Sequence, residues 1–125
     1  MSASKQKGTA AETAVVRWFQ DHGWPRAERR ALSGAYDMGD INLEPGIVVE
    51  VKNTKTITLA EFVAETERER INANAEFGMC VIKKRGTTDP GQFYAVTSLD
   101  QMAWLLRAAG YGHGLWSDVL RGESS

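Results

Sequence analysis

Apolar and polar positions along the chain repeat with two different periods, which distinguish strands from helices. β-Branched and aromatic residues dominate 47–52, 79–82 and 92–96, a composition typical of strands. The shorter runs 26–32 and 40–43 are further strand candidates. The polar segment that follows residue 82 predicts a turn between two of these strands.

Three helices are predicted from their first residues. Each candidate start places Ser or Thr three residues before Glu or Gln, a capping box in which both side chains bind free N–H groups of the first turn. The boxes begin at Thr9, Thr58 and Ser98, and the spacing that follows predicts helix ends near residues 23, 75 and 110.

Each of these helices carries a predicted apolar stripe, which in the first helix consists of Val15, Trp18 and Phe19. In the second helix, the stripe precedes a charged stretch, 67–70, which we expect to be solvated and laced with charge pairs. The stripes consist of Leu59, Phe62, Val63 and Thr66 in the second helix, and of Leu99, Met102, Ala103 and Leu106 in the third.

The resulting order is α-β-β-β-α-β-β-α, without repeats or an interior linker. Such an order predicts an α/β fold in which a mixed central sheet is flanked by helices. We expect a single domain over 1–125, with its core at about 8–110. The tail, 111–125, has an amphipathic pattern and is expected to pack on the body or on a second subunit.

Composition narrows the function classes. The chain of 125 residues has a formal net charge of -1, which excludes a uniformly basic, histone-like DNA binder. One cysteine, Cys80, excludes a disulfide framework and a Cys-rich zinc site, and is expected in the core. No apolar run approaches the roughly 20 residues of a membrane helix, and no hydrophobic segment follows the basic N-terminus. We therefore expect a cytoplasmic protein, in the host cell cytoplasm if it is viral.

The candidate metal-binding and catalytic side chains are concentrated in the segment 40–52, which we interpret as a hairpin of two strands. An odd-length loop centred on Pro45 pairs Leu43 with Ile47, Ile41 with Val49, and Asp40 with Glu50. The core face then carries Ile41, Leu43, Ile47, Val49 and Val51, and the opposite face carries Asp40, Glu50 and Lys52.

Two directly opposed carboxylates repel each other unless a cation lies between them. Carboxylates with retained waters are the ligands that Mg²⁺ prefers, and Mn²⁺ is expected to substitute. Lys52 projects beside the same site, where its compact charge can hold a water or a phosphate oxygen. The combination of two acidic residues that can bind a metal ion with a neighbouring lysine predicts a site for phosphodiester hydrolysis.

Asp40, nine intervening residues and then Glu50-Val51-Lys52 resemble the signature of the PD-(D/E)XK nucleases, the restriction-enzyme-like superfamily. The predicted element order agrees with the common core of that superfamily. A helix start containing Lys7-Gly8 and Glu12, and Ser33-Gly34 ahead of Asp40, are similar to archaeal-type Holliday junction resolvases, a branch also found in viruses. The resemblance covers about residues 5–85.

The resemblance implies a role for each matching residue. Glu12, Asp40, Glu50 and the backbone carbonyl of Val51 would bind the metal. Lys52 would assist the attacking water, and Ser33 would approach the DNA backbone from a mobile loop. These resolvases are homodimers that nick two opposing strands of a four-way junction and leave 5′-phosphates. A dimer also agrees with the need for two symmetric incisions by a domain that carries one site.

One position departs from the family pattern, because Gly39 stands where a proline usually precedes the first acid. Asp37 is therefore a rival for the metal position, although its spacing and the hairpin register favour Asp40.

Phosphate contacts are expected from basic residues around the proposed loop, with salt-dependent and sequence-independent affinity. The basic run 83–85 is explained equally well as a solvated turn. The predicted DNA-binding set is Lys5, Lys7, Arg26, Arg29, Arg30, Ser33, Gly34 and Lys55.

The sequence leaves several functions open. A nuclease for flaps, other replication intermediates or foreign DNA is the alternative within the enzyme class. A catalytically silent DNA-binding module on the same fold is the alternative outside it, and a nuclease acting on RNA is a third.

Overall fold

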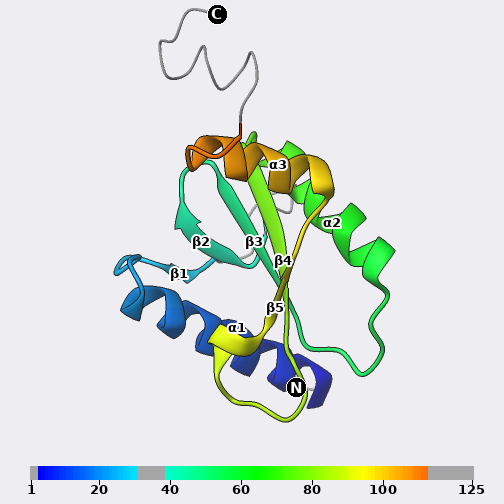
Figure 1. Cartoon of the computed structure of the whole chain (residues 1–125). Coiled ribbons are helices and arrows are strands. Elements are labelled where there is room, and N and C mark those ends of the chain that lie inside the picture. The colour runs from blue at the N-terminus through cyan, green and yellow to red at the C-terminus, as the bar shows by residue number, and fades with distance from the viewer. Residues whose placement is uncertain (1–2, 31–38, 113–125) are drawn as a thin grey trace, which may run out of the picture.

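A computed structural model describes residues 3–30 and 39–112 (Figure 1). Ser33, Gly34, Asp37 and the chain from residue 113 onward lie outside the described residues. In chain order the elements are α1 (Ala3–Asp21), β1 (Glu28–Arg29), β2 (Ile41–Glu44), β3 (Ile47–Lys52), α2 (Leu59–Asn72), β4 (Phe77–Ile82), the 3₁₀-helix η1 (Pro90–Gln92), β5 (Tyr94–Val96) and α3 (Leu99–Ala108).

The strands form one five-stranded mixed sheet in the order β1-β2-β3-β4-β5. The β3–β4 pair is parallel, with α2 as its crossover, and the other neighbouring pairs are antiparallel. The predicted α/β class, the element order and the mixed sheet flanked by helices are confirmed. Among the described helices, none is both long and apolar enough to cross a membrane.

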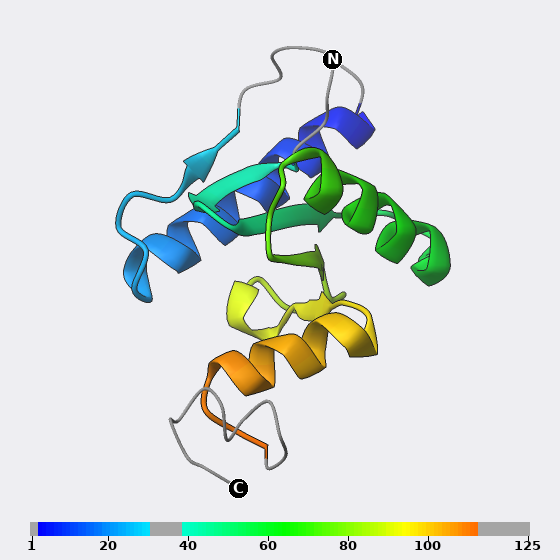
Figure 2. The same cartoon turned by 90° about the horizontal axis from the view of Figure 1, so that it is seen from above.

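Helices α1 and α2 cover opposite faces of the sheet (Figures 1 and 2). Alternation along β3 and β4 explains this division, because successive side chains point to opposite faces. Val49, Val51 and Val81 pack with α1, whereas Cys80 and Ile82 pack with Phe62 of α2. The prediction of Cys80 as a core residue is confirmed, since its side chain is completely buried.

The hairpin between β2 and β3 differs in part from the predicted one. Ile41 pairs with Val49 as predicted, but Glu44, not Leu43, pairs with Ile47. The expected odd-length loop is therefore wrong, and the connection is a two-residue turn at 45–46.

A β-bulge between Asn42 and Glu44 compensates for the shorter turn. The extra residue in β2 shifts the register by one position, so that the side chains before the bulge keep their predicted faces. Gly46 adopts a positive φ of 91°, which suits the tight turn. The predicted core face is confirmed, with Ile41, Leu43, Val49 and Val51 buried and Ile47 packed against them.

The first helix begins six residues earlier than predicted. Helix α1 extends from Ala3, so the expected capping box at Thr9 is wrong and Glu12 lies in the helix interior. Thr9 accepts a hydrogen bond through its carbonyl from the Thr13 hydroxyl at 2.9 Å. Ala3, Lys5, Gln6 and Lys7 are good helix formers, which favours continuation of the helix toward the N-terminus despite Gly8.

Helices α2 and α3 begin directly after Thr58 and Ser98, as predicted, but the Thr58 side chain makes no capping hydrogen bond, so the expected capping box there is wrong. The buried faces of both helices also differ from the expected stripes. Helix α2 ends at Asn72 rather than near 75, and Glu69 is buried although its segment was expected to be solvated. In α3, the Ser98 hydroxyl caps the helix, but Leu99 is 84% exposed and no residue of α3 is buried.

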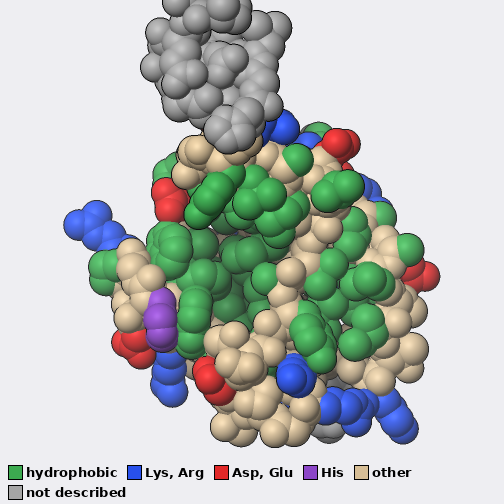
Figure 3. Space-filling model, viewed as in Figure 1, with side chains coloured by type: hydrophobic (Ala, Val, Ile, Leu, Met, Phe, Trp, Pro, Cys, Tyr) green, Lys and Arg blue, Asp and Glu red, His purple; other side chains and the backbone are tan. Residues whose placement is uncertain are grey.

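Helix α3 contacts the sheet with its other side. The Gln101 side chain accepts a hydrogen bond from Gly78 N–H at 2.9 Å, and Trp104 stacks on Phe77 with ring centroids 6.3 Å apart. Between α1 and α3 the molecular surface is hollowed and lined by apolar side chains (Figure 3).

Candidate metal centre

Asp40 is fixed at the beginning of β2 by its main chain and its side chain together. Its N–H donates to the carbonyl of Val49 at 2.9 Å, and its carbonyl accepts from Arg30 N–H at 2.8 Å. Its Oδ2 accepts from the N–H of Val51 at 2.8 Å. Asp40 therefore lies beside the Glu50–Lys52 segment of β3, where the hairpin register predicts it.

Gly39 explains how the chain reaches Asp40 without the proline that the family pattern places there. Its φ is +96°, a conformation that proline cannot adopt because its ring fixes φ near -65°. A Cβ atom at this position would lie 2.9 Å from Cγ1 of Val48 and 3.1 Å from the carbonyl oxygen of Val49. Glycine is thus required both by backbone conformation and by space.

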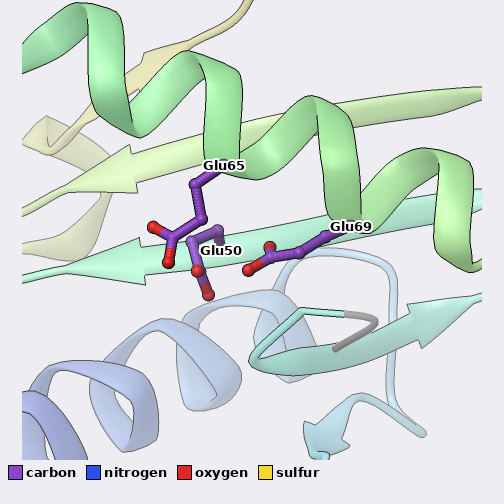
Figure 4. Close-up of side chains that lie close together, drawn as sticks. All are labelled: Glu50, Glu65 and Glu69. Atoms are coloured by element: carbon purple, nitrogen blue, oxygen red, sulfur yellow. The ribbon is translucent and has the colours of Figure 1, made fainter. Parts of the chain in front are cut away.

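Glu50 lies in the middle of β3 and points toward α2. Figure 4 shows its carboxylate directed toward those of Glu65 and Glu69, which descend from successive turns of α2. One ligand oxygen from each of the three residues lies within 4.8 Å of the other two. Glu50 and Glu69 are 3% and 1% exposed, so this cluster is closed to solvent on its inner side.

The pKa of Glu50 is that of a carboxyl group whose negative charge is not compensated by its surroundings. Burial raises the pKa of Glu50 to about 12, and the neighbouring carboxyls of Asp40 and Glu69, both within hydrogen-bonding reach, add to this increase. No N–H group of the described residues donates to its buried Oε1. Without a metal ion, Glu50 therefore carries a proton even beside Lys52, whereas a divalent ion would stabilise the carboxylate.

Lys52 is the cation closest to these acids within the described part of the chain. Its Nζ lies 2.5 Å from Glu65 Oε2 and 3.7 Å from Glu50 Oε2. It also lies 5.4 Å from the ring centroid of Phe62. Burial alone would lower the pKa of Lys52, but Glu65, Glu50 and Asp40 more than offset this and raise it. Lys52 is therefore an ammonium at neutral pH, suited to holding an oxygen rather than to accepting a proton.

Glu12 lies close to Asp40 but is bound to another partner. Its Oε2 accepts from Nε of Arg29 at 2.9 Å and lies 2.9 Å from Nη2 of the same side chain. Burial and the Asp40 charge raise the pKa of Glu12, while Arg29 opposes them. Its predicted structural role in a capping box is wrong, and its predicted role as a metal ligand stays a prediction.

The other predicted site residues are distributed around this centre. Val51, expected to offer its carbonyl, contacts Asp40 through its N–H. Arg30 adjoins Asp40, and its Nε is buried without a hydrogen-bond partner among the described residues. Arg26 is exposed at a turn, and Lys55 is exposed beyond the end of β3.

The remaining members of the predicted DNA-binding set lie near the start of α1 or outside the described residues. Lys5 and Lys7 lie in the first two turns of α1. Ser33 and Gly34 fall outside the described residues, as does Asp37, the rival metal ligand.

The sequence analysis missed the contribution of α2 to the centre. Phe62, Thr66 and Glu69 are the buried residues of α2, and they follow helical spacing. Continuing the predicted stripe by three residues therefore places Glu69 on the buried face, and Glu65 precedes it by one turn. An acidic residue, Glu69, on the predicted buried face of the helix was the signal in the sequence that could have indicated this contribution.

Together these side chains can hold a metal ion. Glu50, Glu65 and Glu69 form one candidate ligand group, and Asp40 adjoins Glu50 from β2. Oxygen ligands alone favour a hard cation over zinc or copper. Burying several carboxylates costs free energy unless a cation or protons compensate them.

Comparison with known proteins adds no further assignment. No family model matches the sequence, and no curated protein or solved structure matches it.

Proposed function

We propose that this protein is a divalent-metal-dependent endonuclease that hydrolyses DNA phosphodiester bonds. The observation that carries the proposal is the placement of Asp40 and Glu50 side by side, with Lys52 next to Glu50 on the same strand. A scaffold protein gains nothing from acidic side chains packed around a buried Glu50 whose pKa they raise. A hydrolytic centre needs them to bind an ion.

The residues present fit Mg²⁺ or Mn²⁺, with Asp40 and Glu50 as ligands and Glu69 or Glu65 completing the oxygen set. When bound, such an ion polarises the phosphoryl group and lowers the pKa of a bound water. The buried Oε1 of Glu50, which no N–H group of the described residues reaches, supports this fit.

Lys52 supplies a second, fixed positive charge beside the acids. Its ammonium can donate hydrogen bonds to the attacking water or to a non-bridging phosphate oxygen, which orients the nucleophile and offsets developing charge. Hydrolysis then joins the water oxygen to phosphorus and releases the 3′-oxygen, so that the product carries a 5′-phosphate.

Within this class we propose a PD-(D/E)XK enzyme with a restriction-endonuclease-like core, and a four-way junction as the substrate. The proposal rests on the Asp40…Glu50-Val51-Lys52 spacing and on the matching element order. Paired incision requires two centres, which a homodimer provides. The exposed apolar residues of α3, such as Leu99 and Leu106, are consistent with a surface that a second copy covers.

A cleavage assay tests the proposal directly. Wild type and Asp40→Asn are incubated with labelled four-way junction, flap and linear duplex DNA, with Mg²⁺, with Mn²⁺ and with chelator. We expect metal-dependent cutting of the junction by wild type, and loss of cutting by Asp40→Asn with its circular dichroism spectrum unchanged. Glu61→Gln, an exposed acid in the first turn of α2, is the matched control and should cut normally.

The outcomes separate the alternatives. Preference for flaps or linear duplex would replace the resolvase by another nuclease of the same class. Binding of branched DNA without cleavage under any metal would favour the catalytically silent module.

A further inference from the structure

A basic cleft lies directly beyond the metal centre, at the carboxyl ends of the parallel strands β3 and β4. Its volume is about 1160 Å³. It is lined by the loop that follows β3, by the turn that follows β4, and by one residue of β5. The lining residues are Asn53, Thr54, Lys55, Ile57, Lys83, Lys84, Arg85, Gly86 and Tyr94.

The charge of this cleft differs sharply from that of the whole chain. Four of its lining residues are Lys or Arg and none is Asp or Glu, although the chain has a net charge of -1. Lys55 and Lys84 are exposed, and no acidic side chain of the described residues forms an ion pair with either. Their charges are therefore available to an anion.

Hydrogen bonds hold the two sides of the cleft at a fixed separation. Arg85 Nη2 donates to the carbonyl of Lys55 at 3.2 Å, which links the turn to the loop. Lys83 N–H donates to the carbonyl of Lys52 at 2.9 Å, so the cleft begins one residue beyond the lysine of the metal centre. Lys83 Nζ also donates to the carbonyl of Thr87 at 3.3 Å. These contacts distinguish the cleft from a freely solvated turn.

The cleft also offers apolar surface next to its charges. Tyr94 is 48% exposed and Ile57 is 50% exposed. Stacking of a base on an aromatic ring requires that the base is unpaired, because a base inside a duplex is already stacked on both faces. A polyanion with flat apolar groups matches this combination better than a simple anion does.

We infer that this cleft binds a DNA strand next to the scissile phosphate, with Lys55 and Lys84 on its phosphates and Tyr94 stacked on an unpaired base. The inference rests on the proposed function and specifies its substrate class: DNA that presents an unpaired nucleotide beside the cleavage site. Flaps, gaps and single-stranded arms present such a nucleotide directly, and a four-way junction presents one when base pairs at its branch point open, whereas a continuous duplex presents none.

Binding measured in chelator, where no cleavage occurs, tests the phosphate contacts. Fluorescence anisotropy of a labelled single-stranded oligonucleotide is recorded over a range of salt concentrations. Lys55→Gln/Lys84→Gln should reduce the slope of log K against log salt by about 1.4, since each phosphate contact contributes about 0.7 for single strands. The control Arg17→Gln/Arg107→Gln removes the same charge from α1 and α3, and should leave the slope unchanged. An equal change in both double variants would overturn the inference, because net charge would then explain binding.

The aromatic contact has its own test. Tyr94→Leu should weaken binding of the single strand at least about fivefold, the low end for loss of one base stack, and should leave duplex binding unchanged. Tyr94→Phe keeps the aromatic ring and should bind the single strand like wild type. Tyr111→Leu removes another exposed tyrosine and should not change the affinity for the single strand. Wild-type affinity in Tyr94→Leu would exclude the stacking role.

The two proposals can fail separately. If wild type cuts no DNA but the cleft variants lose binding, the nuclease proposal fails and the cleft stands. If wild type cuts DNA and the cleft variants bind and cut equally well, the cleft assignment fails and the nuclease stands.

Discussion

The ammonium of Lys52 lies 2.5 Å from the carboxylate of Glu65, closer than it lies to Glu50. Helix α2 thus fixes the position of the lysine that β3 carries. Glu65 is a positioning residue in this arrangement, because it sets where the positive charge stands relative to Asp40 and Glu50.

Substitution at these two positions should separate charge from position. Lys52→Gln should abolish cleavage, because the fixed cation is lost, whereas Glu65→Gln should slow it about tenfold through misplacement of the lysine. Single-turnover cleavage at saturating Mg²⁺ measures both effects, with Glu61→Gln as the control. Wild-type rates in Glu65→Gln would show that the ion pair has no part in positioning.

Metal affinity should depend on acids from both β2 and α2. We expect Asp40→Asn and Glu69→Gln each to weaken Mn²⁺ binding at least about tenfold, the effect typical of lost ligands or their supporting groups. Titration followed by electron paramagnetic resonance of free Mn²⁺ gives the affinities. Glu61→Gln should bind like wild type, and an unchanged affinity in Glu69→Gln would remove Glu69 from the centre.

Stability should fall as pH rises when no metal is present. Burial and the nearby carboxyls raise the pKa of Glu50 to about 12, so the native protein keeps a proton that the unfolded chain loses above pH about 4.3. The unfolded state therefore binds fewer protons, and the free energy of unfolding decreases from pH 5 to pH 9.

Glu50→Gln removes this pH dependence, because the amide stays neutral. In chelator at pH 8 it should melt at least about 3 °C above wild type, the shift that roughly 1 kcal/mol produces in a domain of this size. The difference should shrink at pH 5. Glu67→Gln is the contrasting control, since the hydrogen bond from Arg70 lowers the pKa of Glu67 and its loss should not raise the melting temperature. Thermal melts of wild type and both variants at pH 5 and pH 8 measure these differences. A melting temperature of Glu50→Gln below that of wild type at pH 8 would contradict the prediction that native Glu50 keeps its proton.

Gly39 should tolerate no side chain. Gly39→Ala should lower the free energy of unfolding by about 1–3 kcal/mol, because it combines a strained φ with a contact of 2.9 Å to Val48. Gly8→Ala is the matched control in α1, where a Cβ meets nothing within 4 Å and stabilisation of up to about 1 kcal/mol is expected. Urea unfolding measures both, and a neutral Gly39→Ala would show that the backbone there relaxes easily.

The hairpin shows how far hydrophobic alternation predicts this fold. The core face of 41–51 was predicted correctly because one misplaced residue would bury Asp40 among valines. The turn was predicted wrongly, because alternation constrains which face a residue takes and not where an extra residue is inserted. A bulge and a two-residue turn satisfy the same pattern as an odd-length loop.

The candidate site was predicted only as far as local sequence determines it. Asp40, Glu50 and Lys52 lie within one hairpin, whose register brings them together. Glu65 and Glu69 come from the crossover helix, and their approach to Glu50 depends on how α2 packs across the sheet.

Exposure was hardest to predict where a helix has two apolar sides. In α3, Leu99 belongs to a regular stripe yet is exposed, while Gln101 and Trp104 on the other side contact the sheet. Spacing alone does not identify which side the sheet will take.

Cys80 is the chain's single cysteine, and it lies buried on β4 beneath Phe62 and Thr66 of α2. Alkylating reagents can reach its thiol only when that helix lifts away. The rate of alkylation would therefore report how often the helix that carries Glu65 and Glu69 opens. A metal ion bound between these residues and Glu50 should lower that rate.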